Sequence, residues 1–250
     1  MRFSINIPNF GDFAGADTVA RVASAAEAAG WDALFVWDHI VHYRRYQRSF
    51  GDPWILLTAA ALATTRIKLG PLVTPVPRRR PHQLARQEST LDHLSDGRVI
   101  FGAGLGVPIE DEYGSFGEPT DPRLLAERLD EGLYLLDRYW SGEPVTHDGR
   151  HYHVEDVTLL PRPVQRPRVP VWIGGFWPHR PPMRRAARWD GAVPLFCPPS
   201  MATLHPSTRS ATWSASSVVS GRATLAGHSR SSWVGPVPPT PPTRATCWVR

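Results

Sequence analysis

The residues best suited to chemistry stand where predicted strands end. Trp37-Asp38-His39 closes the second predicted strand, and Thr74 closes the third. An imidazole changes its charge near neutral pH, so His39 is a candidate proton donor or acceptor. Asp38 is a candidate to orient that imidazole or to contact a cofactor, and Thr74 offers a hydroxyl nearby. The alternative for His39 is a rim histidine that meets only water.

Two glycine-containing strand ends follow later in the chain. The fourth predicted strand runs into Gly102-Ala103-Gly104-Leu105-Gly106, and the fifth ends in Gly174-Gly175. Glycines at every second position let a flat ring or a phosphate approach the backbone, and loop amides late in a barrel often hold phosphates. We therefore interpret Gly102, Gly104, Gly174 and Gly175 as candidates for cofactor binding, with a Gly-Gly turn that binds nothing as the alternative.

Paired histidines and a run of arginines offer other chemistry. His39 and His42 are three residues apart, and His151 and His153 two apart, but a metal site needs three or four ligands. The second pair is interpreted as the surface face of a hairpin strand. The run 78–80, three consecutive arginines, is interpreted as a solvated loop, with a phosphate or nucleic-acid contact as the alternative.

The elements that position these residues alternate between apolar runs and helical patterns, which favours a parallel sheet. Strands are predicted at 3–7, 33–37, 66–73, 98–102, 169–173 and 192–196, and helices at 18–29, 53–63, 81–94, 122–140 and 182–188. Residues 142–170 break this rhythm and are interpreted as an excursion with a small hairpin. Six βα-like units predict a TIM barrel over residues 1–196. A doubly wound sheet is the rival, but the segment after the first strand is no phosphate loop.

The last part of the chain differs in kind. Residues 191–250 hold five arginines and no acid, whereas residues 1–190 hold 23 basic and 23 acidic residues, so the net charge of +5 comes from the tail. Residues 236–242 contain five prolines, which do not suit a helix or an inner strand. Residues 197–250 are therefore interpreted as an irregular tail, either disordered or translated in a wrong frame, and the last two βα units are not recognisable.

Composition limits the class of protein. The chain has 250 residues, of which 42% are hydrophobic and 20% charged, as is ordinary for a soluble globular protein. No basic face for nucleic acid and no apolar run long enough for a bilayer can be identified. With two cysteines and no signal peptide, a reduced cytoplasmic protein is expected.

Several stretches together resemble the luciferase-like monooxygenase family, whose members are flavin- and deazaflavin-dependent barrels. The resemblance covers residues 1 to about 196. The matching stretches are residues 28–39, 65–70, 96–104, 111–117, 128–133, 170–175 and 185–191, and the resemblance depends on their order and spacing. It departs from some deazaflavin-dependent members at Val107, where they have a glutamate, and at residues 176–182.

The resemblance implies a TIM barrel that binds reduced FMN, or the deazaflavin coenzyme F-420, at its mouth. It implies that the third strand bulges at a cis peptide bond, here Leu72-Val73, which backs the ring beside Thr74. His39 matches the family's histidine beside the ring. With FMN, oxygen would be passed to a small-molecule substrate, and a separate flavin reductase is an expected partner. With the deazaflavin, hydride alone would move.

Three functions stay open at this stage. The first is the FMN-dependent monooxygenase, with the deazaflavin-dependent oxidoreductase as its alternative. A metal-dependent barrel hydrolase that uses His39 and His42 is the second, and an inactive barrel remnant is the third. Related barrels commonly pair, so a homodimer is also expected, whereas nucleic acid and membrane partners are not.

Overall fold

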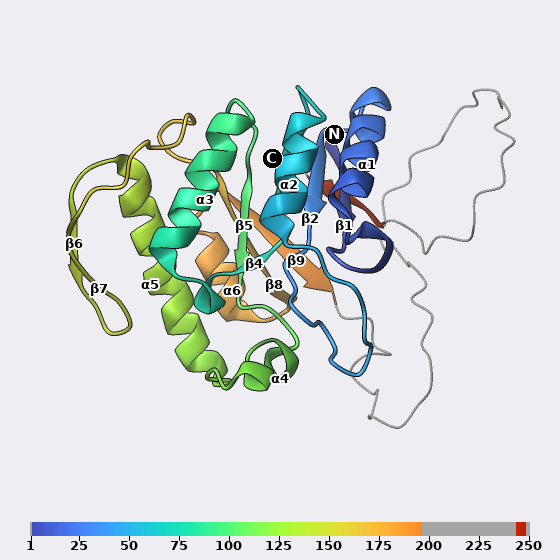
Figure 1. Cartoon of the computed structure of the whole chain (residues 1–250). Helices are drawn as coiled ribbons and strands as arrows, with labels where there is room; N and C mark the ends of the chain where they lie inside the picture. The colour runs from blue at the N-terminus through green and yellow to red at the C-terminus, as the bar shows by residue number, and fades with distance from the viewer. Residues whose placement is uncertain (1, 197–243, 249–250) are drawn as a thin grey trace, which may run out of the picture.

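The computed structural model describes residues 2–196 and 244–248 and shows α-helices packed on parallel strands (Figure 1). The strands are β1 (Arg2–Ile7), β2 (Ala33–Val36), β3 (Lys68–Pro71), β4 (Thr74–Pro75), β5 (Phe101–Gly104), β6 (Val145–Asp148), β7 (His153–Val157), β8 (Val171–Trp177), β9 (Gly191–Phe196) and β10 (Arg244–Trp248). The helices are α1 (Ala16–Ala28), α2 (Pro53–Leu62), α3 (Pro81–Leu94), α4 (Ile109–Glu112), α5 (Pro122–Ser141) and α6 (Arg180–Ala186).

The strand order follows the chain in one direction, as it does in a barrel. One sheet has the order β10-β1-β2-β3 and the next has the order β4-β5-β8-β9. The backbone of Leu69 joins them, because its N–H donates to Arg98 O and its oxygen accepts from Ile100 N. A doubly wound sheet reverses its direction at a switch point, so the rival fold is wrong. Among the described residues, no pairing joins β9 to β10.

Local sequence signals explain where the long helices begin and end. Asp52 accepts hydrogen bonds from the N–H groups of Trp54 and Ile55, and Pro53 occupies the first turn of α2. Asp121 caps α5 in the same way. Gly142 ends α5 with φ 78°, a left-handed conformation that favours glycine. These caps place both helices where the apolar periodicity predicts them.

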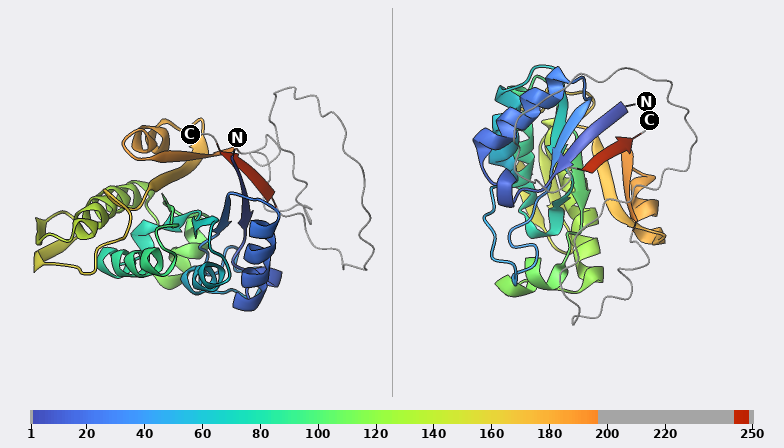
Figure 2. Two further views of the ribbon diagram at one scale, coloured as in Figure 1. Left: turned by 90° about the horizontal axis from the view of Figure 1, so that it is seen from above. Right: turned by 90° about the vertical axis from the view of Figure 1, so that its right-hand side faces the viewer.

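Alternation along the strands produces two apolar layers. Leu34 and Val36 of β2 face the helices and join the large core between sheet and helices. Ala33 and Phe35 face the other way and join a small cluster with Leu72 and Ile100 inside the barrel. The helices therefore cover only the outer side of the strands, as the view from above shows (Figure 2).

The N-terminal ends of the strands are tied together by two charged side chains. The guanidinium of Arg98 is buried and donates to the carbonyl oxygens of Ser95, Ala61, Thr64 and Ile67 and to the Thr64 hydroxyl. The Glu27 carboxylate accepts from the backbone N–H groups of residues 65–67. Every donor and acceptor named here has a partner, so this end is built for stability.

Most predicted elements are confirmed, and three differ. The third strand is interrupted after Pro71 and resumes as the short β4. The excursion contains the expected hairpin, β6–β7, although His151 lies in its turn and not on a strand. Within the predicted irregular tail, β10 forms a strand antiparallel to β1, while residues 197–243 lie outside the described residues. None of the described helices has both the length and the apolar character needed to cross a lipid bilayer.

Candidate functional site

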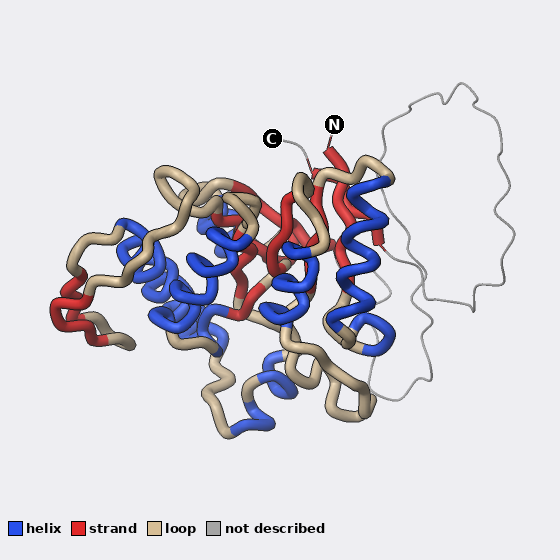
Figure 3. Tube along the Cα trace, turned by 45° about the horizontal axis from the view of Figure 1, so that its top comes forward, coloured by secondary structure: helices blue, strands red, loops and turns tan. Residues whose placement is uncertain are grey.

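Two long loops, which follow β2 and β5, lie at the same end of the molecule (Figure 3). They leave the carboxyl ends of their strands, where the active sites of TIM barrels are built. The first loop carries Asp38, His39 and His42, and the second leads into α4 with Glu112. Contacts between these two loops define the candidate site.

Asp38 lies buried directly after β2 and is paired with arginines. Its carboxylate accepts from Arg78 Nη2 at 2.8 Å and from Arg79 Nε at 3.0 Å. The side chains of these arginines are only 5% and 19% exposed. The interpretation of the arginine run as a solvated loop is therefore wrong for its first two members, because they neutralise buried carboxylates at the mouth.

Glu112, at the end of α4, holds the loop that carries His39. Its carboxylate is fully buried and accepts from His39 Nδ1 at 3.2 Å and from the N–H groups of residues 40–42 at 2.6–3.2 Å. It also accepts from Arg78 Nη1. Glu112, rather than Asp38, thus orients the imidazole, because no hydrogen bond joins Asp38 to the His39 ring in the described residues.

The charge of Glu112 fixes the tautomer of His39. Burial opposes ionisation of Glu112, but the hydrogen bond from His39, the Arg78 guanidinium and the Ile40 N–H lower its pKa to about 2. An ionised carboxylate only accepts hydrogen bonds, so Nδ1 of His39 carries the proton that it donates. Nε2 is then the ring atom left for other chemistry.

The backbone of His39 is held from the first strand. Asn9 is fully buried, and its side-chain oxygen accepts from the His39 N–H at 3.2 Å. Its amide group donates to the oxygens of His39 and Gly51, each at 2.8 Å. The rings of Phe10, Trp37 and His42 lie around the imidazole with centroids 4.6–6.2 Å away. His39 is therefore fixed at its backbone, at its ring nitrogen and on its faces.

The third strand turns inward at a cis peptide bond between Leu72 and Val73, the position that the resemblance implies. Val73 lies against two of the predicted glycines. A Cβ at Gly104 would lie 2.7 Å from Val73 Cγ2, and one at Gly174 would lie 2.7 Å from Val73 Cγ1. Both positions are glycine because Val73 occupies the space that a side chain would need. The Val73 side chain is then the surface on which a ring would lie.

Gly102 and Gly175 also have protein neighbours. A Cβ at Gly102 would collide with the Pro71 carbonyl oxygen and lie 2.8 Å from Leu72 Cδ1, and one at Gly175 would collide with Pro182 at the start of α6. Close packing of the chain explains both glycines. Direct contact of these four glycines with a cofactor stays a prediction.

Three buried polar atoms at or inside the mouth have no partner among the described residues: Thr74 Oγ1, Asn6 Oδ1 and His42 Nδ1. Thr74 follows the bulge, and Asn6 alternates with the outward-facing Ile5 and Ile7, so its side chain faces into the barrel. Burial also lowers the pKa of His42 to about 4, with smaller contributions from His39 and Arg48. Buried polar atoms of this kind require a partner, so the mouth suits a ligand with polar edges.

A metal centre is not supported by the described part of the chain. The rings of His39 and His42 are 4.6 Å apart between centroids, but no third ligand joins them. Residues 2–196 and 244–248 contain no group of three or more His, Cys, Asp or Glu side chains placed to hold a metal ion. The hydrolase hypothesis therefore lacks the ligand set that it needs.

Sequence reasoning missed three residues that hold the site: Glu112, Asn9 and Arg78. Glu112 lies within one of the stretches that carry the family resemblance, but nothing in its local pattern distinguishes it from the exposed Glu110. Asn9 lies two residues after the end of the first strand, and this position at a strand end was the available signal. Partners for Arg78 are 34 and 40 residues away in the chain, so its sequence neighbours reveal neither.

The chain is similar in sequence to several F420-dependent enzymes. The chain is 32% identical over 167 residues to the F420-dependent glucose-6-phosphate dehydrogenase of Nakamurella multipartita, which covers 66% of this chain and 48% of that relative. It is 35% identical over 158 residues to the enzyme of the same name from Intrasporangium calvum, covering 61% and 46%. The chain spans about half the length of these relatives.

Solved structures of related proteins are similar to this chain in fold. The monooxygenase RslO1 from Streptomyces bottropensis is similar at a TM-score of 0.61 and 29% identity, covering 70% of this chain and 53% of that one. The coenzyme F420-dependent tetrahydromethanopterin reductase from Methanopyrus kandleri gives a TM-score of 0.59 at 25% identity, covering 70% and 50%. These barrels confirm the expected fold class. The sequence model described as luciferase-like monooxygenase matches residues 1–192, and the chain therefore belongs to the luciferase-like monooxygenase family.

Proposed function

We propose that this chain is the barrel of an oxidoreductase that binds a deazaflavin at its mouth and exchanges a hydride with a small organic substrate. The observation that carries the proposal is the fixed His39 imidazole, whose Nδ1 donates to Glu112 and whose Nε2 has no such bond to any described residue. The similarity to F420-dependent glucose-6-phosphate dehydrogenases favours the deazaflavin over FMN, the cofactor that the sequence analysis puts first.

The residues of the mouth fit a flat ring with polar edges. Val73, supported by Gly104 and Gly174, offers an apolar surface against which one face of the ring would lie. Thr74 Oγ1 and Asn6 Oδ1 are buried without partners and would bond polar atoms at its edge. Leu72, Val73 and Thr74 are thus the proposed ring-binding residues, while Gly102 and Gly175 act through the packing of the chain.

When bound, the reduced ring supplies or accepts the hydride. The protein orients the substrate and handles the proton. Because Glu112 keeps the proton of His39 on Nδ1, a substrate hydroxyl or carbonyl oxygen would exchange its proton with Nε2. Asp38 would not take part in this exchange, since both of its carboxylate oxygens are held by Arg78 and Arg79.

A second candidate is monooxygenation with reduced FMN and molecular oxygen. The similarity to the monooxygenase RslO1 favours it. In that case a separate flavin reductase would provide the reduced ring. Because the residues at the mouth would hold either ring, a binding experiment is needed to identify the cofactor.

The test is a titration of the full chain with coenzyme F420 and, without oxygen, with reduced FMN. We expect saturable binding of the deazaflavin and hydride transfer from an alcohol substrate. Replacing His39 by Asn should lower kcat by about 10²–10⁴-fold, as expected for loss of a general acid–base group. The matched variant H93N, at an exposed histidine near the end of α3, should leave kcat unchanged. Binding of neither ring would overturn the proposal and favour the inactive remnant.

A further inference from the structure

A cleft lies on the outer layer of the molecule and begins at Arg80, the residue that follows the mouth arginines Arg78 and Arg79 in the chain. It has a volume of about 140 Å³ and is lined by the start of α3, by Leu135 and Tyr139 of α5 and by the β6–β7 hairpin. Polar and basic groups line it, among them Arg80, His82, Tyr139, Tyr152 and His153. None of the residues that form the mouth lines this cleft, so the proposed ring-binding site does not explain it.

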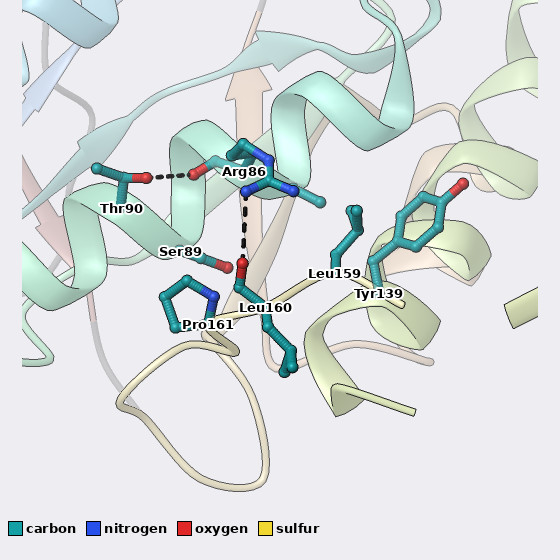
Figure 4. A pocket seen from close by; sticks show the side chains of 8 residues that line it. Arg86, Ser89, Thr90, Tyr139, Leu159, Leu160 and Pro161 are labelled. Carbon is teal, nitrogen blue, oxygen red and sulfur yellow. Dashed lines mark hydrogen bonds between the residues drawn. The ribbon is translucent and has the colours of Figure 1, made fainter. Parts of the chain in front are cut away.

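The walls of the cleft are held in place by hydrogen bonds. Glu131 of α5 accepts from Tyr152 N at 2.9 Å and from His147 Nε2 at 3.0 Å, which fixes the hairpin on the helix. A neighbouring pocket shares Tyr139 with this cleft, and in it Arg86 of α3 donates to Leu160 O at 3.4 Å (Figure 4). The cleft is thus a built feature between fixed elements.

Two arginines beside the cleft have no counter-ion. In the part of the chain that the structure describes, the side chains of Arg80 and Arg128 form neither an ion pair nor a hydrogen bond. Both act on the hydroxyl of Tyr152: burial raises the pKa of this phenol, Arg128 and Arg80 lower it, and Glu131 raises it. Of these two arginines only Arg80 lines the cleft, together with His82, His151 and His153, and no Asp or Glu of the described residues lines it, so its lining favours an anion.

The nearby carboxylates are already engaged. Glu127 binds Arg150 at 3.0 Å and His151 at 3.1 Å, and Glu131 holds the hairpin backbone. Neither neutralises Arg80 or Arg128. Drug-sized ligands occupy pockets of about 300–1,000 Å³, so a cleft of about 140 Å³ suits a smaller guest.

We propose that this cleft is a second binding site, which takes an oxyanion of phosphate size. The guanidinium group of Arg80, which lines the cleft, supplies the charge, and the Tyr152 hydroxyl donates a hydrogen bond. Arg128 adds to the positive potential from outside the lining. Guanidinium groups match the geometry of phosphate oxygens and stay charged at all accessible pH values. The site is independent of the ring proposed for the mouth.

The test is calorimetric titration of the full chain with inorganic phosphate at constant ionic strength. We expect one saturable site, with R80Q weakening binding about tenfold and R128Q and Y152F each weakening it by a smaller factor. The matched variant R21Q removes an exposed arginine of α1 and should bind phosphate as the wild type does.

Two results would overturn the proposal. One is the absence of saturable binding up to about 10 mM phosphate, since a built site should exceed that affinity. The other is equal affinity in the wild type, R80Q, R128Q and Y152F, which would place the bound phosphate elsewhere, the mouth included. Y152F keeps the aromatic ring, so it tests the hydroxyl without opening the hairpin. Unfolding midpoints measured without phosphate check that each variant is folded.

Discussion

The two ends of the barrel satisfy their polar groups differently. At the N-terminal ends of the strands, Arg98 and Glu27 bond to one backbone group after another. At the mouth, Thr74 Oγ1, Asn6 Oδ1 and His42 Nδ1 are buried without a partner. The other unpartnered buried atoms of the described residues belong to Trp54, Glu88 and Trp140 in the helices. The difference indicates that one end holds the fold together, while the other is arranged for a ligand.

The largest effect on the free energy of unfolding is expected at the N-terminal ends of the strands. Replacing Arg98 by Ala would leave four buried carbonyl oxygens without their donor. We expect the free energy of unfolding to fall by about 3–5 kcal/mol, as measured by urea denaturation. The variant R138A, at an exposed arginine of α5, should change it by less than about 0.5 kcal/mol. Similar losses in both variants would show that Arg98 does not tie this end.

The second largest effect is expected at Glu112. Its contribution to the free energy of unfolding depends on pH. Its pKa is about 2 in the folded protein and 4.5 ordinarily, so its stabilisation is present above pH 4.5 and is lost as the pH falls toward 2. Replacement by Gln should cost about 3 kcal/mol at neutral pH and should remove this acid-dependent loss. Denaturation curves between pH 3 and 7 check this.

The matched control for that series is E110Q, at an exposed glutamate of the same helix. It should keep both the stability and the acid-dependent loss of the wild type. A parallel pH dependence in E112Q and the wild type would contradict the role assigned to the Glu112 carboxylate.

A smaller effect is expected where Val73 packs on glycine. G104A would place its Cβ 2.7 Å from Val73 Cγ2, so we expect a loss of about 1–3 kcal/mol. Removing the valine methyl groups in the double variant V73A/G104A should recover part of this loss. A double-mutant cycle of unfolding free energies measures the coupling. Additive losses would mean that Gly104 is needed for a reason other than Val73.

The smallest effect on stability is expected at Thr74. Valine has the same shape without the unpartnered hydroxyl, so T74V should change the free energy of unfolding by less than about 1 kcal/mol. Its affinity for the ring should nevertheless fall several-fold. T90V, which removes a hydroxyl bonded to Arg86 O, serves as the control and should bind the ring unchanged. Unchanged affinity in T74V would exclude Thr74 from the ring site.

Periodicity and caps were sufficient to predict the outer layer. The strands at 3–7 and 33–37 and the helices at 53–63 and 122–140 match β1, β2, α2 and α5 within two residues at each end. These elements are predicted correctly because their apolar residues pack against neighbouring elements, β2 with both faces and α5 with one stripe. The break between β3 and β4 came only from the family resemblance, since residues 66–73 alone read as one strand.

Contacts between residues far apart in the chain explain which features of the candidate site could not be predicted from the sequence. Arg78 looks like part of a solvated charge run until Asp38 and Glu112 are folded against it. Glycines 104 and 174 look like openings for a cofactor until Val73 occupies the space. The assignment of His39, Thr74 and the glycines to cofactor binding is still a prediction.

The most direct test of the account follows the two ring nitrogens of His39. The full chain, labelled with ¹⁵N-histidine, would be titrated with coenzyme F420 and observed by NMR. We expect Nε2 of His39 to shift on binding while Nδ1 stays protonated and bonded to Glu112. Binding of the ring with both His39 nitrogens unmoved, or a proton on Nε2 in place of Nδ1, would contradict the proposed mouth site.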